Sequence, residues 1–579
     1  MNSNSLKYLF TAAFFCISVT AFSQDPIGTE VINVVRPYTP TVADAFKIKE
    51  TPVMIDSLNM EKKNVQYSIF SVPVASTFVP AKGKATTLER RRPDKLFDNY
   101  VTLGFGNYTT ALGELYATFE VDRDSEVSLF FKHNSSQGGI KDVKLDDHYF
   151  DTNLDLNYSG NTREMQYNLG FGALHEIYNW YGLPEFATED EIQIATDAGV
   201  NHSFYGVAVK GNLKMTDSPF SGGEALLRYF GDSYSSSEIN FIATPEFLFD
   251  LGNQDVGINV DIDYLSGKFD KGFLFPEDEI KYSFLNAGVH PYIRFQNEGF
   301  SINLGAQVVF GMDNENSESD IFIYPKVDAS FRVVDEFLSF YAGVDGGLDQ
   351  NSYFNFTREN PYVSPTLIIA PTDRQYEGYA GIQGKFTSTV SYNLKGSYKN
   401  EINKPLFVSN PLMSTVPMDE LQGYEFGNSF AVIYDDVTTL EIFGELQAEV
   451  STGINIGVNA SFFSYSLDFL PEAFNLPEFK ATVFANAVFN EQFFGGLSLF
   501  YVGERKDIES FDPFFPVEPV SRTLDGYLDA NIHLGYNLNP QLTFFVRGSN
   551  LLSDNYEKWL NTPVQGIQVL GGATYKFNW

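Results

Sequence analysis

Strict alternation of apolar and polar residues, repeated along most of the chain, is the feature that most limits what this sequence can fold into. In residues 454–462, isoleucine, valine, alanine and phenylalanine occupy every second position, and asparagine, glycine and serine lie between them. The same pattern occurs in residues 150–158, 256–264, 302–310 and 392–399. A period of two places one kind of side chain on each face of a β-strand. No segment after residue 24 contains the roughly 18 consecutive apolar residues of a membrane helix, so the sequence predicts an all-β protein.

Strands with one apolar face fit two architectures. A water-soluble sandwich or propeller buries that face inside, and a membrane barrel turns it toward lipid. The alternating segments are longer than the strands of about five or six residues that are usual in soluble sheets, and their length suits a tilted crossing of the bilayer. The 55 Phe and 33 Tyr residues also gather near strand ends, as the aromatic girdles of a barrel require. These features favour a transmembrane antiparallel β-barrel.

Short turns alternate with long polar stretches between the predicted strands. Short turns belong on the periplasmic side of such a barrel and long loops outside. Threading the chain by this rule gives about 22 strands between Asn99 and Trp579, with both ends in the periplasm. The segment Phe430–Tyr434 resembles a strand but would make the number odd, so we place it in an extracellular loop hairpin. The predicted turns are 122–124, 160–162, 252–254, 296–298, 334–335, 388–389, 451–453, 490–491 and 539–540, and the predicted long loops are 136–148, 178–199, 266–280, 349–373, 401–437, 467–476, 505–520 and 551–564.

The first 24 residues have the pattern of a cleaved signal peptide. An apolar stretch, residues 9–17, is followed by the small residues Ala21 and Ser23 just before Gln24, as at a signal-peptidase site. The stretch is too short to cross roughly 30 Å of hydrocarbon as an anchor. Cleavage between Ser23 and Gln24 removes Cys16, the single cysteine of the sequence. Disulfides, thiolate metal sites and cysteine nucleophiles are therefore excluded from the mature protein.

The C-terminal end of the chain resembles a known family. Residues 527–532, the turn 537–540, the run 542–552 and the closing run 566–577 follow one another in order. This arrangement resembles the last three strands of TonB-dependent receptors, whose penultimate strand enters a loop through an Asn-Leu-Phe-like sequence. The resemblance implies a barrel in the cell outer membrane that acts as a receptor or transporter.

The terminal aromatic residues carry a further implication of this resemblance. Tyr575, Phe577 and Trp579 look like the C-terminal signal by which the barrel-assembly machinery recognises its substrates. The resemblance therefore implies that this machinery and the outer-membrane lipid are partners of the chain. Its composition and its cleavage site are also similar to those of exported proteins of Bacteroidota.

The segment that precedes the first strand departs from the family. A TonB-dependent receptor carries a globular plug there, and only residues 25–98 lie between the signal peptide and the barrel of this chain. The segment is rich in proline and lacks a plug-like glycine-rich signature. We expect it to be a short, extended periplasmic or lumenal segment, so that a standard plug is missing. This departure argues against import energised by TonB.

A short apolar motif lies near the mature N-terminus. Val31, Ile32, Asn33, Val34 and Val35 are similar in place and character to a TonB box. The alternative is an ordinary β-segment that lines the barrel or pairs with a partner, because short motifs match easily. The expected partner is accordingly TonB or another outer-membrane or surface lipoprotein subunit.

A basic cluster, formed by Arg90, Arg91 and Arg92, lies just before the first predicted strand. It either contacts lipid headgroups or the acidic face of a partner, or it belongs to a solvated linker. The whole chain carries a formal net charge of −35. Such a charge excludes a nucleic-acid partner, because phosphate neutralisation needs clustered lysine and arginine. Residues 25–95 contain 11 basic and 8 acidic side chains, so the excess of acidic residues belongs to the barrel and its loops.

No catalytic, cofactor or metal site is predicted. The six histidines are scattered without the paired spacing of a metal motif, and the sequence has no nucleophile elbow, phosphate loop or dinucleotide fingerprint. The acidic run 313–320 offers oxygen ligands for a hard cation, but it lacks the glycine turn and the spacing of a calcium loop. A solvated loop is the simpler interpretation, and we expect no enzyme.

Three function classes remain for this chain. It is a receptor or transport barrel, a passive porin, or a non-transport structural or assembly subunit of an outer-membrane complex, for example of a barrel- or lipoprotein-assembly machine. A lumen enclosed by about 22 strands is wide enough that it is normally plugged. We expect residues 25–98, a partner, or infolded loops such as 349–373 and 401–437 to block it.

Overall fold

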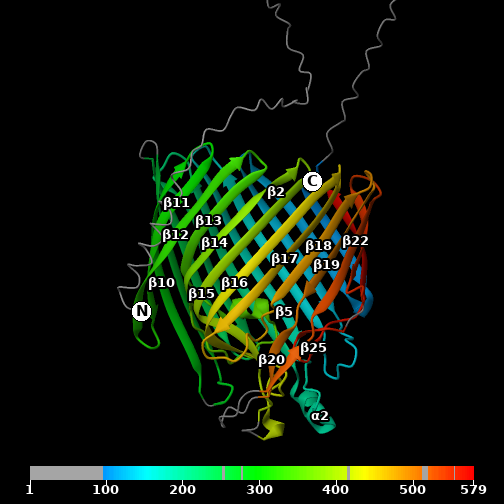
Figure 1. Ribbon diagram of the computed structural model, residues 1–579. Helices are drawn as coiled ribbons and strands as arrows, with labels where there is room; N and C mark the ends of the chain where they lie inside the picture. Colours follow the sequence, from blue (N-terminus) through cyan, green and yellow to red (C-terminus); the bar gives the residue numbers. More distant parts are fainter. Residues whose placement is uncertain (1–95, 251–253, 276–277, 414–416, 511–519, 553–554) are drawn as a thin grey trace, which may run out of the picture. The chain divides into compact units, whose positions relative to one another are not determined.

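The computed structural model describes residues 96–250, 254–275, 278–413, 417–510, 520–552 and 555–579. These residues form a closed, 22-stranded antiparallel β-barrel, which confirms the predicted fold class (Figure 1). Two α-helices occur among the described residues, α2 (Glu189–Ala198) and α3 (Tyr353–Glu359). Neither is long and apolar enough to cross a membrane.

The barrel wall consists of strands that follow one another around the sheet. In chain order they are β1 (Asn99–Gly106), β2 (Ala111–Asp122), β3 (Ser125–Ser136), β4 (Tyr149–Asn161), β5 (Met165–Asn179), β6 (Asn201–Met215), β7 (Phe220–Asp232), β8 (Ser237–Asp250), β9 (Asp255–Phe269), β10 (Ile280–Gln296), β11 (Phe300–Asp313), β12 (Glu318–Val334), β13 (Leu338–Asp349), β14 (Thr372–Thr387), β15 (Val390–Ser409), β16 (Phe430–Ser451), β17 (Ile454–Leu467), β18 (Phe479–Val488), β19 (Phe493–Val502), β22 (Tyr527–Asn537), β23 (Leu542–Ser549) and β26 (Gln568–Phe577). Two small hairpins lie outside this sheet, β20 (Arg505–Ser510) with β21 (Val520–Leu524), and β24 (Glu557–Trp559) with β25 (Thr562–Pro563).

The first and last strands of the sheet close the barrel. Strand β1 pairs antiparallel with both β2 and β26, and Val101 lies opposite Tyr575 while Phe105 lies opposite Gly571. Closure leaves no sheet edge whose backbone groups would lack partners in lipid. The closed sheet therefore meets the main requirement of a membrane-spanning barrel.

The connections follow the predicted alternation of turns and loops. Nine short turns were predicted from the sequence, and eight of them lie at one end of the barrel in the described residues; the ninth, 252–254, lies largely outside them. The prediction missed the short turn 216–219 between β6 and β7. At the other end, called the loop end here, lie α2 and the two hairpins (Figure 1). Three loop-end connections are also short, namely those that follow β1, β7 and β11.

The predicted limits of the loop 401–437 are wrong. Strand β15 continues to Ser409 and β16 begins at Phe430, so the loop itself covers only residues 410–429. The segment Phe430–Tyr434 does lie in a hairpin, as predicted, but it is the first part of β16 and pairs with the end of β15. The two strands are so long that they continue past the length needed to cross a bilayer.

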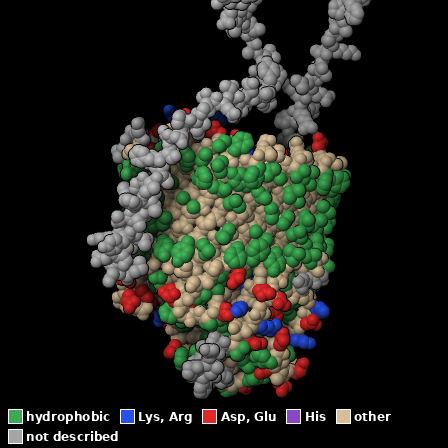
Figure 2. All heavy atoms as spheres, viewed as in Figure 1, with side chains coloured by type: hydrophobic (Ala, Val, Ile, Leu, Met, Phe, Trp, Pro, Cys, Tyr) green, Lys and Arg blue, Asp and Glu red, His purple; other side chains and the backbone are tan. Residues whose placement is uncertain are grey.

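The apolar faces of the strands point outward. Side chains of Asp232 and Glu238 contact α3 inside the barrel. Every second residue from them along the strand, together with its partners directly across the sheet, therefore lines the lumen. The residues between these form the exterior. On the exterior of β17, Ile456, Val458 and Phe462 are 39–47% exposed to the surroundings of the barrel. Figure 2 shows that hydrophobic side chains cover the outer wall, whereas charged side chains gather toward the loop end. The wall thus has the exterior that a bilayer requires.

The predicted terminal aromatic residues lie at the barrel seam. The Trp579 ring stacks on Phe119 at 5.1 Å between centroids, and its Nε1 donates to the Thr118 carbonyl oxygen at 2.9 Å. Tyr575 and Phe577 lie on β26 opposite residues of β1. These contacts lie at the turn end of the barrel, opposite the loops. The role of the three residues as an assembly signal stays a prediction.

A charge substitution tests the assignment of the two strand faces. We expect Val458→Arg to impair membrane insertion, because an arginine at the middle of the bilayer costs about 2–4 kcal/mol. Asn459→Arg is the matched control, since Asn459 faces the lumen, and we expect it to insert normally. The measurement is the yield of heat-modifiable barrel in the outer-membrane fraction. Equal yields for the two variants would contradict the assignment.

Candidate functional site at the loop end of the lumen

Helix α3 and the loop that carries it lie inside the barrel at the loop end. Tyr353 and Phe356 belong to one buried hydrophobic cluster with side chains from β6, β7, β9 and β10 on one side, and from β15, β16 and β24 on the other. Only a segment in the lumen can contact wall strands so far apart around the sheet. The β13–β14 loop, residues 350–371, therefore closes part of the lumen, which confirms the expected infolding of 349–373.

Local sequence explains why α3 begins where it does. The Ser352 side chain accepts a hydrogen bond from the Asn355 backbone N–H at 3.1 Å, which is the usual N-cap interaction. The other free N–H groups of the first turn bind the barrel wall, because Glu238 accepts from Tyr353 N at 2.7 Å and from Phe354 N at 3.3 Å. A carboxylate of β8 thus completes the start of a helix that lies far away in the sequence.

A second wall carboxylate, Asp232 at the end of β7, holds the Tyr353 side chain. Its Oδ2 accepts from Tyr353 Oη at 2.7 Å and lies 3.1 Å from His202 Nε2. Asp232, His202 and Tyr353 are all buried. Burial first, and the Asp232 charge second, raise the pKa of Tyr353 well above its usual value, so its hydroxyl remains a donor. Loss of one partner from a buried hydrogen-bonded group costs about 1–3 kcal/mol, and more when the group is charged.

The C-terminal end of α3 is fixed by an ion pair. The Arg358 guanidinium binds the Glu176 carboxylate of β5 through two parallel hydrogen bonds, one of them 2.5 Å long. This bidentate geometry is the strong form of the interaction. The Phe354 ring also contacts two guanidinium groups, that of Arg228 at 3.8 Å and that of Arg358 at 4.9 Å from its centroid. Both ends of α3 are therefore bound to the wall.

Other loops lock onto the same region. The Trp180 ring stacks on His202 at 4.3 Å, and its Nε1 donates to the Tyr362 carbonyl oxygen at 3.0 Å. Asn428 Nδ2 donates to the Trp180 carbonyl oxygen at 2.7 Å. The β5–β6, β13–β14 and β15–β16 loops are thus connected by buried hydrogen bonds. A second hydrophobic cluster, which contains Trp180 and Tyr424, fills the space between them.

The β20–β21 hairpin adds a further buried carboxylate at the loop end. Asp507 accepts hydrogen bonds from Ser409 N at 3.0 Å, from Ile508 N at 2.7 Å and from Asn475 Nδ2 at 2.8 Å. Burial raises the pKa of Asp507 to about 6, although these three donors lower it. The hairpin therefore joins β15 and the β17–β18 loop through a group that titrates close to neutral pH.

The lumen wall between α3 and the turns is polar. Arg374 of β14 forms ion pairs with Asp345 at 2.8 Å and with Asp349 at 3.0 Å, and Lys326 binds Asp345 at 2.7 Å. A cavity of about 520 Å³ lies along this wall, beside Lys326 and Asp345. Among the described residues, no group of histidine, cysteine and acidic side chains could hold a metal ion.

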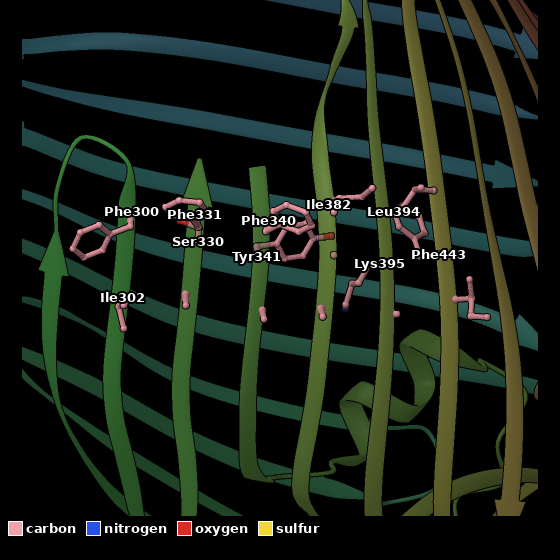
Figure 3. Close-up of a pocket in the computed structure, with 16 residues that line it drawn as sticks. Phe300, Ile302, Ser330, Phe331, Phe340, Tyr341, Ile382, Leu394, Lys395 and Phe443 are labelled. Carbon is pink, nitrogen blue, oxygen red and sulfur yellow. The ribbon is translucent and has the colours of Figure 1, made fainter. Parts of the chain in front are cut away.

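A larger hollow lies on the exterior, not in the lumen. It has a volume of about 910 Å³, and Figure 3 shows its side chains on neighbouring strands. Small residues, among them Ala329, Ala342 and Ala380, lie between larger ones such as Phe331 and Phe340. Because this surface faces the bilayer, lipid chains fill such a hollow, and we assign no ligand to it.

The other residues singled out in the sequence do not contribute to this site. Val31, Ile32, Asn33, Val34, Val35 and the cluster Arg90, Arg91, Arg92 lie outside the described residues. In the acidic run 313–320, the Asp313 side chain accepts from the backbone of Glu315 and Asn316 and so stabilises the turn. Sequence reasoning missed the wall residues that bind α3. Their one signal was a charged residue at a lumen-facing position, which many other positions share.

Comparisons with known proteins show the fold. No family model matches the chain, and no curated protein matches it. Similar solved structures include the FrpB iron transporter from Neisseria meningitidis (F3-3 variant), with 10% identity, a TM-score of 0.64, and coverage of 84% of this chain and 82% of that one. The pyoverdine outer membrane receptor FpvA from Pseudomonas aeruginosa PAO1 has 13% identity, a TM-score of 0.60, and coverage of 84% and 80%. The copper transporter OprC has 11% identity, a TM-score of 0.59, and coverage of 84% and 82%.

The raised pKa of Asp507 predicts a pH dependence of the loop end. Its pKa of about 6 lies above the ordinary value of 3.8, so the folded state binds more protons between these values. The folded hairpin therefore loses stability as pH rises through about 4 to 6. We expect the amides of Ser409 and Ile508 to be better protected from hydrogen exchange at pH 5 than at pH 7.5, after correction for intrinsic rates.

Asp507→Asn is the control for this pH dependence. The variant lacks the titrating group, so the difference in protection between the two pH values should disappear. Protection that increases with pH in the unmodified protein would contradict the prediction.

Proposed function

We propose that this protein is an outer-membrane barrel of the TonB-dependent receptor type, without a standard plug, that acts as a receptor or transport barrel. The observation that carries the proposal is the binding of α3 to the lumen wall at both ends by Glu238, Asp232 and Glu176. A lumen partly closed by an anchored loop suits a receptor that opens on a signal. It suits a passive porin less well, because a porin needs a permanent channel.

The fold comparisons support the receptor class. The three similar structures named above carry titles of transporters and of a receptor. In this proposal the protein is inserted in the outer membrane by the barrel-assembly machinery after cleavage of its signal peptide. The alternative is a barrel subunit of an outer-membrane complex, and the same closure supports it, because a structural subunit must also keep the envelope sealed.

The anchored loop also bears on the segment before the barrel. Since α3 and its neighbours occupy the loop end, residues 25–98 are not needed as a stopper there. We infer that this segment is a tether for another outer-membrane or lipoprotein subunit rather than a TonB-driven element, with residues 31–35 as its binding motif. Extended, it reaches well over 100 Å at about 3.3 Å per residue, which is enough to contact a periplasmic partner.

Release of α3 tests the closure. We expect the unmodified protein to give little conductance in planar bilayers, and a variant with residues 352–360 replaced by a Gly–Ser linker of equal length to give large, steady channels. Glu176→Gln combined with Arg358→Gln removes one anchor without leaving an unpaired charge, and it should give intermediate opening. We expect these results because the loop that carries α3 is, in this proposal, the barrier to ions.

The matched control removes an exposed ion pair at the same end. Lys268 and Glu279 interact at 2.8 Å outside the lumen, so Lys268→Gln with Glu279→Gln should leave the conductance unchanged. An unmodified protein that conducts like an open pore would contradict the closure and favour a porin.

Removal of the N-terminal segment tests its role. A chain that starts at Asp98 should show the same conductance as the full mature chain but should lose the proteins that co-purify from native membrane. Mass spectrometry of the two purified samples measures this loss. Larger channels after removal would instead identify the segment as a stopper, and abolished TonB-dependent uptake of a ligand would identify it as a TonB-coupled element.

A further inference from the structure

A separate cavity opens at the loop end between the barrel wall and the infolded loop. Its volume is about 460 Å³, within the range of about 300–1,000 Å³ that is usual for small-ligand pockets. The ends of β10, β11 and β12 form one side, and residues 368–371, which connect α3 to β14, form the other. It is distinct from the polar wall cavity beside Lys326.

One side of the cavity, called its floor here, is apolar, and hydrogen bonds fix the backbone beside it. Ile368 is 65% exposed, whereas its neighbours Leu367 and Ile369 are buried. The Tyr434 hydroxyl donates to the Ile368 carbonyl oxygen at 3.0 Å and accepts from Ala370 N at 3.1 Å. These two bonds fix the backbone on both sides of Ile368. Because Phe322, Leu348 and Ile369 line the same cavity, Ile368 belongs to an apolar surface that an apolar group can contact.

The rim of the cavity is acidic. Glu315, Glu318 and Asp320 line it from the β11–β12 hairpin and are exposed. None of these three forms an ion pair with a described residue. The one lysine of the lining, Lys281, is bound to Glu279 at 2.7 Å. Within the described part of the chain, the rim therefore has a net negative charge that no ion pair neutralises.

We propose that this cavity binds a basic peptide that carries an apolar side chain, with the apolar group on Ile368 and the cationic groups against Glu318 and Asp320. The proposal rests on the proposed receptor function and names its ligand class. Complementary charge steers a cationic ligand to the rim and excludes an anionic one. A bare metal ion does not explain the apolar floor, and no group of described residues could hold one.

The position of the cavity connects binding to the closed lumen. Residues 368–371 belong to the same loop as α3, and Asp373, which follows them, accepts from Tyr324 Oη at 2.8 Å. A ligand seated on Ile368 therefore contacts the loop that closes the lumen. Binding shifts the loop from its closed arrangement to an open one only if the ligand has a higher affinity for the open arrangement.

Short blocked peptides test the ligand class directly. The protein in lipid nanodiscs is titrated by calorimetry with acetylated, amidated Lys-Leu-Lys, and with Lys-Ser-Lys, Ser-Leu-Ser and Glu-Leu-Glu as comparisons. We expect Lys-Leu-Lys to bind at least tenfold more tightly than each of the other three. Glu318→Gln with Asp320→Asn should weaken Lys-Leu-Lys at least tenfold, and Ile368→Ser at least threefold.

A pair of acidic residues elsewhere on the loop end is the matched control. Glu189 and Asp190 lie in the exposed first turn of α2, and Glu189→Gln with Asp190→Asn should leave the affinity unchanged. Equal affinity for all four peptides, or full affinity in the Glu318 and Asp320 double variant, would overturn the proposal. Heat-modifiable migration on gels verifies that each variant is folded.

The outcome also separates this proposal from the receptor function. If Lys-Leu-Lys binds at the rim but release of α3 opens no channel, the site stands and the closure model fails. If release of α3 opens the channel but the peptide does not bind, the closure stands and the assigned ligand class is wrong.

Discussion

Pairing of every backbone N–H and C=O group within the wall is the constraint on which the rest of this structure depends. In hydrocarbon an unpaired backbone group costs several kcal/mol, so a spanning sheet must close on itself. Strand β26 supplies the closure by pairing with β1 along its whole length. Once the sheet is closed, its pleat determines which side chains face lipid and which face the lumen, because successive residues point to opposite sides. The apolar exterior and the polar lumen are two consequences of one hydrogen-bonding requirement.

Closure of the sheet also encloses a wide lumen, and the loops must obstruct it. A sheet of 22 strands surrounds a lumen too wide to be filled by the side chains of its own wall. At the loop end, apolar side chains of the wall pack against the infolded segment, and buried polar contacts add to this packing. The segment is bound by Glu176, Asp232 and Glu238, which come from three different strands and are almost completely buried. Each has a specific donor on the loop, and a buried carboxylate without its donor is strongly unfavourable.

The fold was largely predictable, because period-two alternation and turn residues are local properties of the sequence. The error in the length of β16 has one physical source. An alternating segment has the same pattern whether it lies in the bilayer or continues beyond it, so the 22-residue strand β16 was divided into a loop hairpin and a shorter strand. The predicted infolding of 349–373 came from the width of the lumen, a global argument, and it was correct. The same argument could not specify which wall residues would receive the loop.

The sequence by itself determined that the chain is a barrel with an apolar exterior, since each strand carries its own pattern and each turn its own residues. Only the tertiary structure decided the site at the loop end. Tyr353 and Asp232 are 121 positions apart, and Arg358 and Glu176 are 182 positions apart. Whether such residues meet depends on the register of every strand between them and on the closure of the sheet. A lumen-facing glutamate has no local feature that distinguishes it from its neighbours until a helix from the opposite part of the chain lies against it.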